Sequence, residues 1–532
     1  MFTIFLVTIA TIMFACLVFN KISNRLGIPM LLIFILLGMI FGSDGLVKIS
    51  FDDYVLAEQI CTVALIFIMF YGGFGTKWSK AKPVAVKAIL LSSLGTVITA
   101  VLVGVFCYFA LKFDLLESFL VGAVISSTDA ASVFSILRLN RLNLRYNTAS
   151  ILEVESGSND PFAYMLTIVV LSIMGGNSTA FGFGLMLIKQ ISIGLFFGGI
   201  VGVITNYIMN NFKFSVDGFD TIFIVAVAIT SYSTATIYGG NGYLSVYLTG
   251  LILGNMKMNN KKSLVHFFDA ITGLMQMLLF FLLGLLSFPS QLLDVAVPAI
   301  CIFLFLTFIA RPLAVFAVLA PFRSKFNQQL LIAWSGMRGA ASIVFAIVAV
   351  TSPQVTENDI FHIVFFIVLL SILFQGTLIP HVARLFKMVD DKSDVLKTFT
   401  DYSDEVPIKS IEFNLGVNHS WIGAPIANIT LPPDSVIALV IRKGDRLRPS
   451  GQLVLLEKDT LILVGNAIDR KNEMDIYEKE VKKDNDWVGK RISEIKISNL
   501  LILMIRRGGN VIIPKGDTTI LENDIIVINE IE

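Results

Sequence analysis

The stretch VGAVISSTDAASVFSIL (residues 121–137) places four consecutive polar side chains, Ser126, Ser127, Thr128 and Asp129, in the middle of an apolar run. Ser, Thr and Asp compete with a helix for backbone hydrogen bonds. The cluster therefore predicts a helix that unwinds there. In a membrane, unwound backbone is tolerated only where it is buried in protein or lines a cavity. The alternative is four small polar residues at a tight helix interface.

The composition of the whole chain places this run in a membrane. Of the 532 residues, 55% are hydrophobic and 15% are charged, and the mean hydropathy is +0.78. An ordinary soluble protein has about 25% charged residues. Apolar runs long enough to cross a bilayer recur from the N-terminus to about residue 387. The sequence therefore predicts a polytopic α-helical membrane protein, and the net charge of +1 points to no nucleic-acid partner.

About thirteen membrane-spanning helices are expected, and the first is expected to be retained because it lacks a basic leader. They lie near residues 2–20, 28–46, 55–75, 84–111, 116–137, 152–174, 183–209, 219–237, 242–255, 264–286, 292–320, 328–350 and 358–385.

The distribution of basic residues between the connecting loops predicts the orientation. The odd-numbered loops and the segment after the last span carry Lys21, Arg25, Lys77, Lys80, Lys82, Lys87, Arg138, Arg141, Arg145, Lys213, Lys257, Lys261, Lys262, Arg323, Lys325, Arg384 and Lys387. The opposite loops carry only Lys48 and Lys112. Because cytoplasmic loops are enriched in lysine and arginine, we expect the N-terminus outside and the C-terminus in the cytoplasm.

The C-terminal part of the chain is a separate domain that contains an internal repeat. We expect a transmembrane domain over residues 1–390, a linker over 391–404, and two repeats over 405–475 and 476–532. WIGAPIANITLPPDSVIALVIRKGDRLRPSGQLVLLEKDTLILVG (421–465) aligns with WVGKRISEIKISNLLILMIRRGGNVIIPKGDTTILENDIIVIN (487–529), and each half predicts three short strands. The alignment pairs Trp421 with Trp487, Arg442 with Arg506, Gly444 with Gly508, Gly451 with Gly516 and Asp459 with Asp524. We expect a small cytoplasmic α+β regulatory domain.

A second polar cluster, EVESGSND (153–160), lies at the mouth of the sixth expected span. Ser156, Asn159 and Asp160 are spaced i, i+3 and i+4, so a helix presents them on one face. Pro161 follows and is expected to kink or restart the helix. The alternative is a cytoplasmic helix cap, with Ser156 as the capping residue and the acids at the helix N-terminus.

Two arginines lie in later apolar runs and need carboxylate or carbonyl partners there. Arg311 lies in FLTFIARPLAVF (305–316), and Arg338 lies in WSGMRGAASIV (334–344) between Gly336 and Gly339. The flanking glycines predict a second broken helix. Two broken helices in corresponding halves of a chain are the sequence pattern of a secondary transporter with its site at the membrane midplane.

These motifs resemble a known family. SSTDAASVF (126–134), VESGSNDPFAY (154–164), GYLSVYLTGLILGN (242–255) and WSGMRGAASIV together resemble the monovalent cation/proton antiporter superfamily, in its electroneutral NhaP-like, potassium/proton antiporter branch, over roughly residues 1–390. The two tail repeats resemble TrkA-C (RCK_C) domains. The resemblance implies inverted repeats and a core domain that moves against a dimerisation domain, and hence a homodimer.

The resemblance also implies roles for individual residues. Asn159 and Asp160 match the Asn–Asp pair of the sixth helix, Thr128 and Asp129 match the unwound Thr–Asp pair of the fifth, and Ser156 matches the upstream serine. It further implies a structural ion pair, Glu155 with Arg311, and a broken-helix arginine, Arg338, close to Asn159. In one respect the chain departs from the pattern, because many relatives carry a Glu in the third span where this chain has Tyr71.

These residues predict a mechanism. Burial disfavours the charged form of a carboxylate, so Asp160 is expected to bind a proton or a monovalent cation, but not both. Asp129, Thr128 and Ser156 would supply further oxygen ligands. Asn159 cannot carry a proton, so we expect electroneutral exchange of K⁺ for H⁺ across the cell membrane, with Na⁺ as a further candidate substrate. If Asp129 also titrates, the number of protons exchanged per cation would change.

Three other functions are alternatives. They are Na⁺/H⁺ antiport, a ligand-gated K⁺ efflux channel, which lacks a Gly-rich filter here, and a membrane sensor that signals through its tail. No enzyme motif or cofactor site is evident in the sequence. The four cysteines and four histidines lack metal-ligand spacing. We expect the tail to regulate exchange, with a small molecule or nucleotide as its candidate ligand.

Overall fold

The computed structural model describes Phe14, Cys16 and Val18 and two long stretches, residues 29–390 and 408–530, with short gaps. The gaps lie at 141, 177–179, 213–217, 257–260, 355, 417–418, 432–434, 443, 467–474, 482–484, 496–499, 508–509 and 513. The chain divides into two compact units, Met1–Asp404 and Glu405–Glu532. The expected linker over 391–404 lies outside the described residues, as does most of the first expected span.

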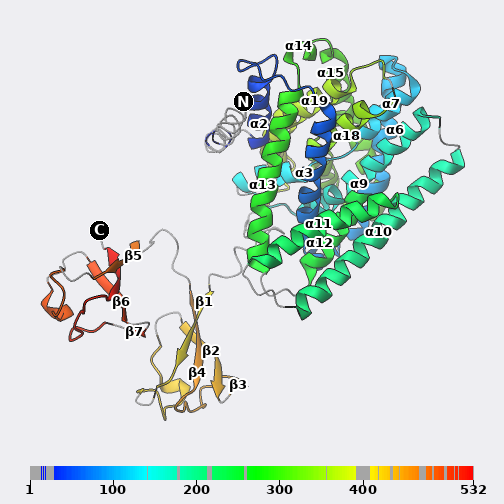
Figure 1. The fold of residues 1–532 in the computed structure, drawn as a ribbon. Helices are drawn as coiled ribbons and strands as arrows, with labels where there is room; N and C mark the ends of the chain where they lie inside the picture. The colour runs from blue at the N-terminus through cyan, green and yellow to red at the C-terminus, as the bar shows by residue number, and fades with distance from the viewer. Residues whose placement is uncertain are drawn as a thin grey trace. The chain divides into compact units, whose positions relative to one another are not determined.

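The first unit is a bundle of helices (Figure 1). Its first part contains α2 (Met30–Phe41), α3 (Tyr54–Gly75), α4 (Trp78–Ala81), α5 (Ala85–Leu90), α6 (Thr96–Phe106), α7 (Leu115–Val124), α8 (Ala130–Leu139), α9 (Thr148–Met174), α10 (Ala180–Asn211) and α11 (Phe219–Ile237). Its second part contains α12 (Gly242–Asn255), α13 (Lys261–Leu286), α14 (Pro289–Leu292), α15 (Ala296–Phe305), α16 (Arg311–Leu319), α17 (Phe326–Trp334), α18 (Ala340–Thr351), α19 (Ile360–Leu370) and α20 (Thr377–Leu385).

In the described part of the chain, seven helical segments are long and apolar enough to cross a membrane. They are Tyr54–Gly75, Ala85–Leu111, Gly182–Asn211, Phe219–Ile237, Ser263–Leu286, Ala296–Phe322 and Ile360–Leu385. Three of them run through π-helical turns, such as η1 (Leu91–Gly95), η3 (Leu306–Ala310) and η5 (Ser371–Gly376). The other expected spans fall on shorter apolar helices, including α2, α7 and α18, on α12, and on the polar helix α9. The unit therefore has a helical membrane fold.

Glycines allow two pairs of helices to approach closely. In the pair α3 and α12, a Cβ on Gly250 would lie 2.2 Å from the Phe70 carbonyl oxygen. In the pair α2 and α13, a Cβ on Gly38 would lie 2.2 Å from the Phe281 carbonyl oxygen. Small residues at helix crossings are how membrane helices pack, because lipid supplies no hydrophobic force between them.

The two crossings correspond to each other within the chain. A shift of 211 or 212 residues takes Gly38 to Gly250 and Phe70 to Phe281. The same shift takes Gly73, whose Cβ would meet the Tyr247 carbonyl oxygen, to Gly284, whose Cβ would meet the Ile35 carbonyl oxygen. The contacts of one crossing are thus repeated in the other.

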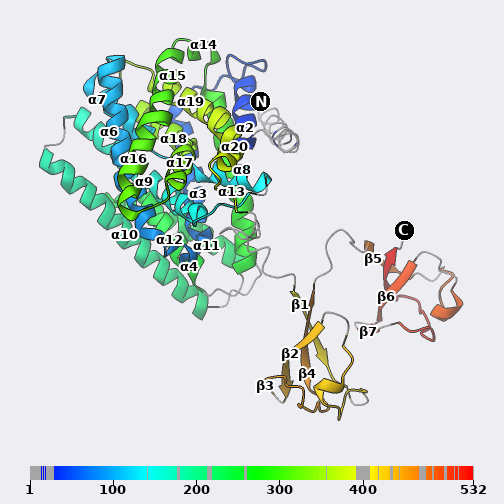
Figure 2. The same cartoon turned by 180° about the vertical axis from the view of Figure 1, so that it is seen from behind.

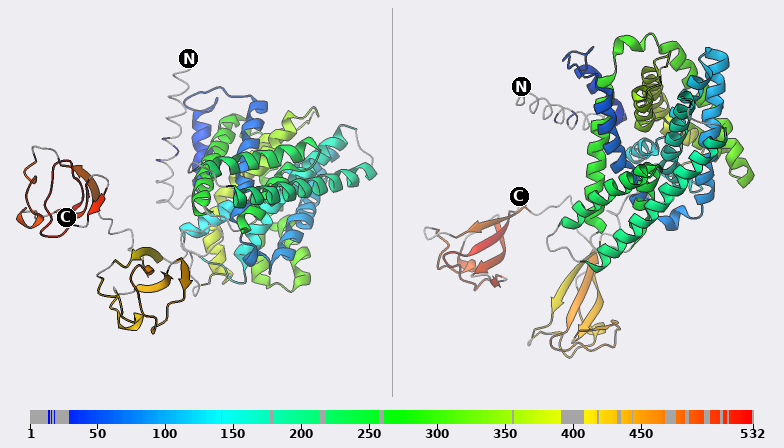
Figure 3. Two further views of the ribbon diagram at one scale, coloured as in Figure 1. Left: turned by 60° about the horizontal axis from the view of Figure 1, so that its bottom comes forward. Right: turned by 45° about the vertical axis from the view of Figure 1, so that its right-hand side comes forward.

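We call α2, α3 and α10–α13 the panel bundle, and α5–α9 with α15–α20 the core bundle. In the panel, α12 packs against α3, α10 and α11, and α13 packs against α2 and α3. Figure 3 shows the long helix α10 running obliquely at the edge of the unit. Figure 2 shows the core helices α16, α17, α18 and α20 on the opposite side.

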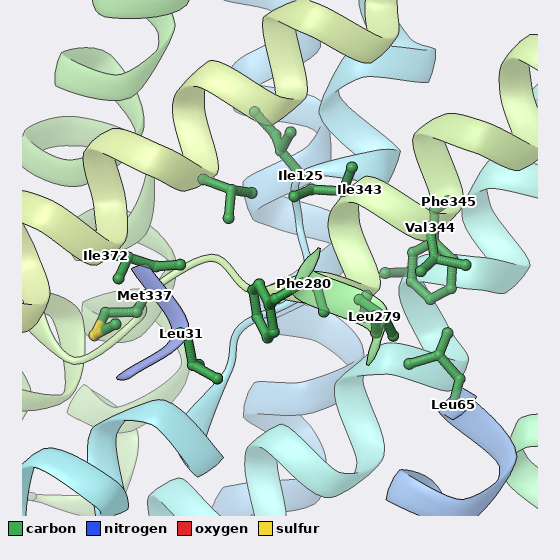
Figure 4. Close-up of a cluster of buried hydrophobic side chains, with 14 of the residues drawn as sticks. Leu31, Leu65, Ile125, Leu279, Phe280, Met337, Ile343, Val344, Phe345 and Ile372 are labelled. Carbon is green, nitrogen blue, oxygen red and sulfur yellow. The ribbon is translucent and has the colours of Figure 1, made fainter. Parts of the chain in front are cut away.

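A continuous apolar core joins the two bundles. Phe345 of α18, Leu65 of α3 and Leu279 of α13 are all buried in it (Figure 4). The seam between panel and core runs along α3, α9, α12 and α18, which pack against one another. The polar clusters described below lie on the core side of this seam.

The second unit contains two four-stranded antiparallel sheets of the same topology. The first has the order β1-β4-β2-β3, from β1 (Ile408–Asn414), β2 (Ser435–Arg442), β3 (Asp445–Leu447) and β4 (Thr460–Asn466). The second has the order β5-β8-β6-β7, from β5 (Asp475–Glu480), β6 (Leu500–Arg507), β7 (Asn510–Ile512) and β8 (Ile525–Glu530). The internal repeat is therefore structural. Each repeat contains a leading strand that the sequence pattern missed, and the only helices among its described residues are short 3₁₀ turns such as η6 (Ile426–Asn428), so the expected α+β class is wrong here.

One residue pairing in the predicted repeat alignment is wrong. Arg442 donates to Asp459 at 2.8 Å, and the equivalent bond in the second repeat joins Arg507, not Arg506, to Asp524 at 2.8 Å. Arg506 instead pairs with Glu478. The bulges in β2 and β6, at Ile437 and Ile502, confirm the same 65-residue shift. Gly508, which the alignment paired with Gly444, lies outside the described residues.

The Arg442–Asp459 pair predicts how the first repeat responds to acid. The Asp459 side chain is fully buried, and the hydrogen bonds from Arg442 lower the pKa of its carboxyl group below the usual 3.8. A lowered pKa in the folded state contributes stability above the unfolded value, and this stability is lost as the pH falls through the folded value. Hydrogen–deuterium exchange of β2 and β4 in the full chain should therefore show constant protection above about pH 5 and a loss below 3.8.

Asp459→Asn should destabilise the first repeat by about 2 kcal/mol at neutral pH, because hydrogen bonds to charged groups contribute roughly 1.5–3 kcal/mol. The second repeat, with Asp524 intact, serves as the internal control. Unchanged protection of the first repeat in the variant would contradict this role for the pair.

Candidate functional site

Two non-helical segments meet in the core bundle. The first follows the end of α7 at Val124 and runs to the start of α8 at Ala130, and the second lies between the end of α17 at Trp334 and the start of α18 at Ala340. The Asp129 N–H donates to the Met337 carbonyl at 2.8 Å, so the segments are joined through their backbones. A Cβ on Gly339 would lie 2.4 Å from the Asp129 Cβ, so only glycine allows this approach.

Asp160 lies beside the first segment, in the middle of α9. Its side chain is buried, with 8% exposure, and its carboxylate accepts a hydrogen bond from the Ser127 hydroxyl. Among the described residues, no lysine, arginine or histidine forms an ion pair with it. Asp160 is therefore a buried carboxylate whose one hydrogen-bond partner is neutral.

Thr128 connects the first segment to α9 through two contacts. Its hydroxyl oxygen accepts from the Asn159 Nδ2 at 2.5 Å, and its carbonyl accepts from the Ser156 hydroxyl at 2.9 Å. Within the described chain the Asn159 Oδ1 is buried and has no hydrogen-bond partner. The structure thus brings Thr128, Ser156, Asn159 and Asp160 together.

Asp129 faces the start of α8 and the second segment. Its carboxylate accepts a hydrogen bond from the Ser132 backbone N–H, at 3.2 Å between N and O, and another from the Ser132 hydroxyl. The carboxylate also lies against Gly339. Asp129 is also two residues from Ser127, whose hydroxyl donates to Asp160. The two carboxylates are therefore neighbours that hydrogen-bond to different hydroxyls.

Arg338 joins the second segment to the first. Its Nη1 donates to the carbonyls of Ser126 at 2.9 Å and Ser127 at 2.6 Å, and its backbone N–H donates to the Ser371 hydroxyl at 2.9 Å. The side chain is 1% exposed, and within the described chain its Nε and Nη2 have no hydrogen-bond partner. The arginine therefore supplies a positive charge to unwound backbone carbonyls.

Glu155 and Arg311 form a buried ion pair between α9 and α16. Glu155 is 1% exposed and Arg311 is 2% exposed. A Cβ on Gly336 would lie 2.5 Å from the Arg311 Nε, so the guanidinium packs on the backbone of the second segment. The positive charge of Arg311 is therefore paired with the carboxylate of Glu155.

The helix-cap interpretation of the second polar cluster is wrong. α9 begins at Thr148, and Ser156 bonds to Thr128 across the bundle instead of capping a helix. The helix also continues through Pro161, so the expected restart does not occur. The Pro161 carbonyl accepts from the Asn241 Nδ2 of the panel at 2.8 Å.

Tyr71, where the sequence departs from the family pattern, donates its hydroxyl to an Asp269 carboxylate oxygen at 3.0 Å. A carboxylate is thus present on the neighbouring helix α13. The sequence reasoning also missed the roles of Ser127 and Ser371. Ser371 left a signal, because it is the one polar residue in the apolar run IVFFIVLLSILF (363–374).

The arrangement suits a monovalent cation or a proton. The Asp160 carboxylate, the Ser127 hydroxyl and the oxygens of Thr128 are hard ligands, which favour alkali cations over soft metals. A hydroxyl both donates and accepts, so Ser127 can donate to a vacant carboxylate and offer a lone pair to a cation. The described residues contain no cluster of three or more His, Cys, Asp or Glu side chains that would hold a transition metal.

Comparison with known proteins extends these observations to the whole chain. A family model described as sodium/hydrogen exchanger, transmembrane, matches residues 9–385, and a TrkA-C domain model matches residues 411–469 and 476–528. The K⁺/H⁺ antiporter NhaP2 of Shewanella sp. strain MR-4 is 34% identical over 452 residues, covering 84% of this chain and 78% of the relative. The K⁺/H⁺ antiporter NhaP of Alkalimonas amylolytica is 34% identical over 469 residues, covering 87% and 81%.

A solved structure shares the fold. The sodium proton antiporter MjNhaP1 from Methanocaldococcus jannaschii at pH 8 matches with a TM-score of 0.62 and 25% identity, covering 70% of this chain and 99% of that chain.

The Glu155–Arg311 contact predicts coupled stability effects. Removing one partner of a buried ion pair leaves an uncompensated charge, which costs about 3–5 kcal/mol. Glu155→Gln and Arg311→Met should each lower the thermal unfolding temperature of the purified protein strongly. The double variant should be milder than the sum of the two shifts, and additive shifts would show that the side chains do not interact.

Proposed function

Because the chain belongs to the sodium/hydrogen exchanger family, a family of membrane transporters, we propose that it exchanges K⁺ for H⁺ across the cell membrane, one for one, with Asp160 as the carrier. The potassium preference is supported by the curated relatives at 34% identity, which are named K⁺/H⁺ antiporters. Na⁺ is the alternative substrate, supported by the name of the structural neighbour.

The observation that carries this proposal is the pairing of charges around the seam. Arg311 is committed to Glu155, and Arg338 is committed to the carbonyls of Ser126 and Ser127. Among the described residues, Asp160 is buried without a permanent positive partner. An isolated buried carboxylate is so costly that it takes up a proton or a cation, and an exchanger uses this alternation.

Alternation at one carboxylate couples the two fluxes. With a proton or a cation bound, Asp160 has no net charge and can pass the apolar barrier of the seam. The vacant, charged form crosses poorly because of its desolvation penalty. Thr128, Asp129 and Ser156 would complete the cation site, and the neutral Asn159 restricts the load to one charge per cycle.

We further propose that the core bundle carries the site past the panel bundle. The α7–α8 and α17–α18 pairs would be two broken membrane helices in inverted repeats, which is a known transporter architecture. The corresponding glycine contacts of the two panel crossings support such a repeat. So do the 27-residue helical segments Ala85–Leu111 and Ala296–Phe322, each of which precedes one of the breaks.

The remaining features of the proposal concern assembly and regulation. The excess of basic residues supports an N-terminus outside and a cytoplasmic tail. The family resemblance supports a homodimer through the panel bundle and regulation by the TrkA-C tail, with a small molecule as the candidate ligand of the tail. A regulator that binds the tail could shift the conformational equilibrium of the transporter only if it binds one conformation more tightly than the other.

Asp160→Asn should abolish exchange while the protein remains folded and inserted, because an amide binds neither a proton nor a cation charge. The measurement is K⁺- and Na⁺-driven proton movement in proteoliposomes, with size-exclusion profiles to confirm folding. Asp220→Asn, on the panel helix α11, is a control that should retain exchange. Substantial exchange by folded Asp160→Asn protein would overturn the assignment of the carrier.

Exchange should also be independent of membrane potential. With K⁺ equal on both sides and a potential imposed by another ion, one-for-one exchange moves no net charge and should take up no protons. Protein-dependent proton uptake driven by the potential would show a different stoichiometry, with Asp129 as the candidate for the extra proton.

A further inference from the structure

A cavity of about 410 Å³ lies between α3, α9 and α18 at one end of the membrane unit. The chain leaves this unit beside the start of α9, where the Asp390 N–H donates to the Asn143 carbonyl at 2.8 Å. We call this end the tail-side face and the opposite end the far face. The cavity is lined by Ile168 and Leu171, near the end of α9, so it lies at the far face.

The cavity lining combines apolar side chains with several polar groups and one acid. Glu58 of α3 supplies a carboxylate, and Thr351, Ser352 and Gln354 supply hydroxyl and amide oxygens. The lining contains no lysine or arginine. Oxygen ligands with one negative charge suit a hard monovalent cation.

An aromatic layer separates this cavity from Asp160. On α9, Asp160, Tyr164 and Ile168 are spaced by four residues and share one face, and at 1.5 Å per residue Ile168 lies about 12 Å beyond Asp160. The Tyr164 ring contacts Tyr243 at 5.0 Å and Phe345 at 5.6 Å between ring centroids. The Tyr164 ring and its two aromatic neighbours therefore lie between the level of Asp160 and the level of the cavity along α9.

The internal repeat gives Glu58 a counterpart. The 211-residue shift that relates the glycine crossings takes Glu58 of α3 to Asp269 of α13. Asp269 bonds to Tyr71, which is 13 residues further along α3 than Glu58, or roughly 20 Å at 1.5 Å per residue. The two acids thus occupy equivalent panel positions nearer opposite faces.

The two acids differ in their contacts with the core bundle. Glu58 accepts from the hydroxyl of Thr351 on core helix α18 at 2.7 Å, so it is tied across the seam at the far face. Asp269 is exposed, and Tyr71, to which it bonds, belongs to the panel. Glu58 therefore joins the panel to the core, whereas the hydrogen bond of Asp269 stays within the panel.

We propose that Glu58 and Asp269 are the cation-access residues of the two faces, each attracting K⁺ or Na⁺ from its own side toward Asp160. The proposal rests on the exchange function proposed above and adds the residues that determine sided affinity. A carboxylate at the mouth of a low-dielectric cleft raises the local cation concentration and the association rate by about 10–10³-fold. Its loss should therefore raise KM on one face and leave kcat unchanged.

The test measures the KM for K⁺ in membrane vesicles that expose either the far face or the tail-side face, identified by protease access to the tail. Glu58→Gln should raise the far-face KM about tenfold, with the tail-side KM and kcat within about twofold of wild type. Asp269→Asn should do the reverse. Glu58→Asp, which keeps the charge, should restore the far-face KM.

Asp52→Asn is the matched control, because it removes an exposed charge six residues before Glu58 and outside the cavity lining. It should leave both KM values unchanged. Equal KM changes on both faces, or none, in folded Glu58→Gln protein would overturn the proposal. Wild-type vesicles without cation-dependent proton exchange would instead overturn the exchange function itself, and the access roles with it.

A second measurement needs no variant. Raising the ionic strength with an impermeant salt from 0.01 M to 1 M shortens the screening length from about 30 Å to about 3 Å. The wild-type KM for K⁺ should rise with ionic strength on both faces. A KM independent of ionic strength would contradict electrostatic capture at either residue.

Discussion

The structure depends on one constraint, which is that unwound backbone inside a membrane must be satisfied by protein. The chain meets it by bringing two non-helical segments, 208 residues apart at Asp129 and Met337, into contact with each other. Arg338 holds the carbonyls of the first segment, and Ser371 holds the N–H of the second. Gly336 and Gly339 are required because a Cβ at either position would collide with Arg311 or Asp129. Breaking one segment would therefore disturb the other.

The same arrangement divides the charges into two kinds. Arg311 and Arg338 are occupied by Glu155 and by backbone carbonyls, so they shape the site without neutralising Asp160. If an arginine were bound to Asp160, its charge would neutralise the carboxylate, which would then need neither a proton nor a cation. Exchange thus depends on a carboxylate that the fold leaves without a permanent counter-charge. The proposed access residues Glu58 and Asp269 add a negative charge near each face, where it would attract the cation.

The sequence predicted the parts of this account that are local. Apolar runs marked the membrane helices, and Ser126–Asp129 and the glycines around Arg338 marked the two segments, because composition and turn residues act on their neighbours. The hydrogen bond from Ser127 to Asp160 and the cation-access cavity could not be predicted, since they join distant helices. The internal repeat of the panel could not be predicted either. Close packing requires glycine only at isolated positions such as Gly38 and Gly250, so the two halves of the panel show no continuous sequence match. In the tail, two adjacent arginines, Arg506 and Arg507, made the alignment ambiguous by one residue, and the contact of Arg507 with Asp524 and the bulge at Ile502 resolve it.

The central claim is that Asp160 holds either one proton or one cation. Proton release on cation binding tests it most directly, without transport or membrane potential. Purified protein in a weakly buffered solution near neutral pH is titrated with K⁺, with choline as the control for ionic strength, and released protons are counted with a pH indicator. The account predicts saturable release approaching one proton per chain, and none from Asp160→Asn. Saturable K⁺ binding without proton release, or equal release by Asp160→Asn, would contradict it.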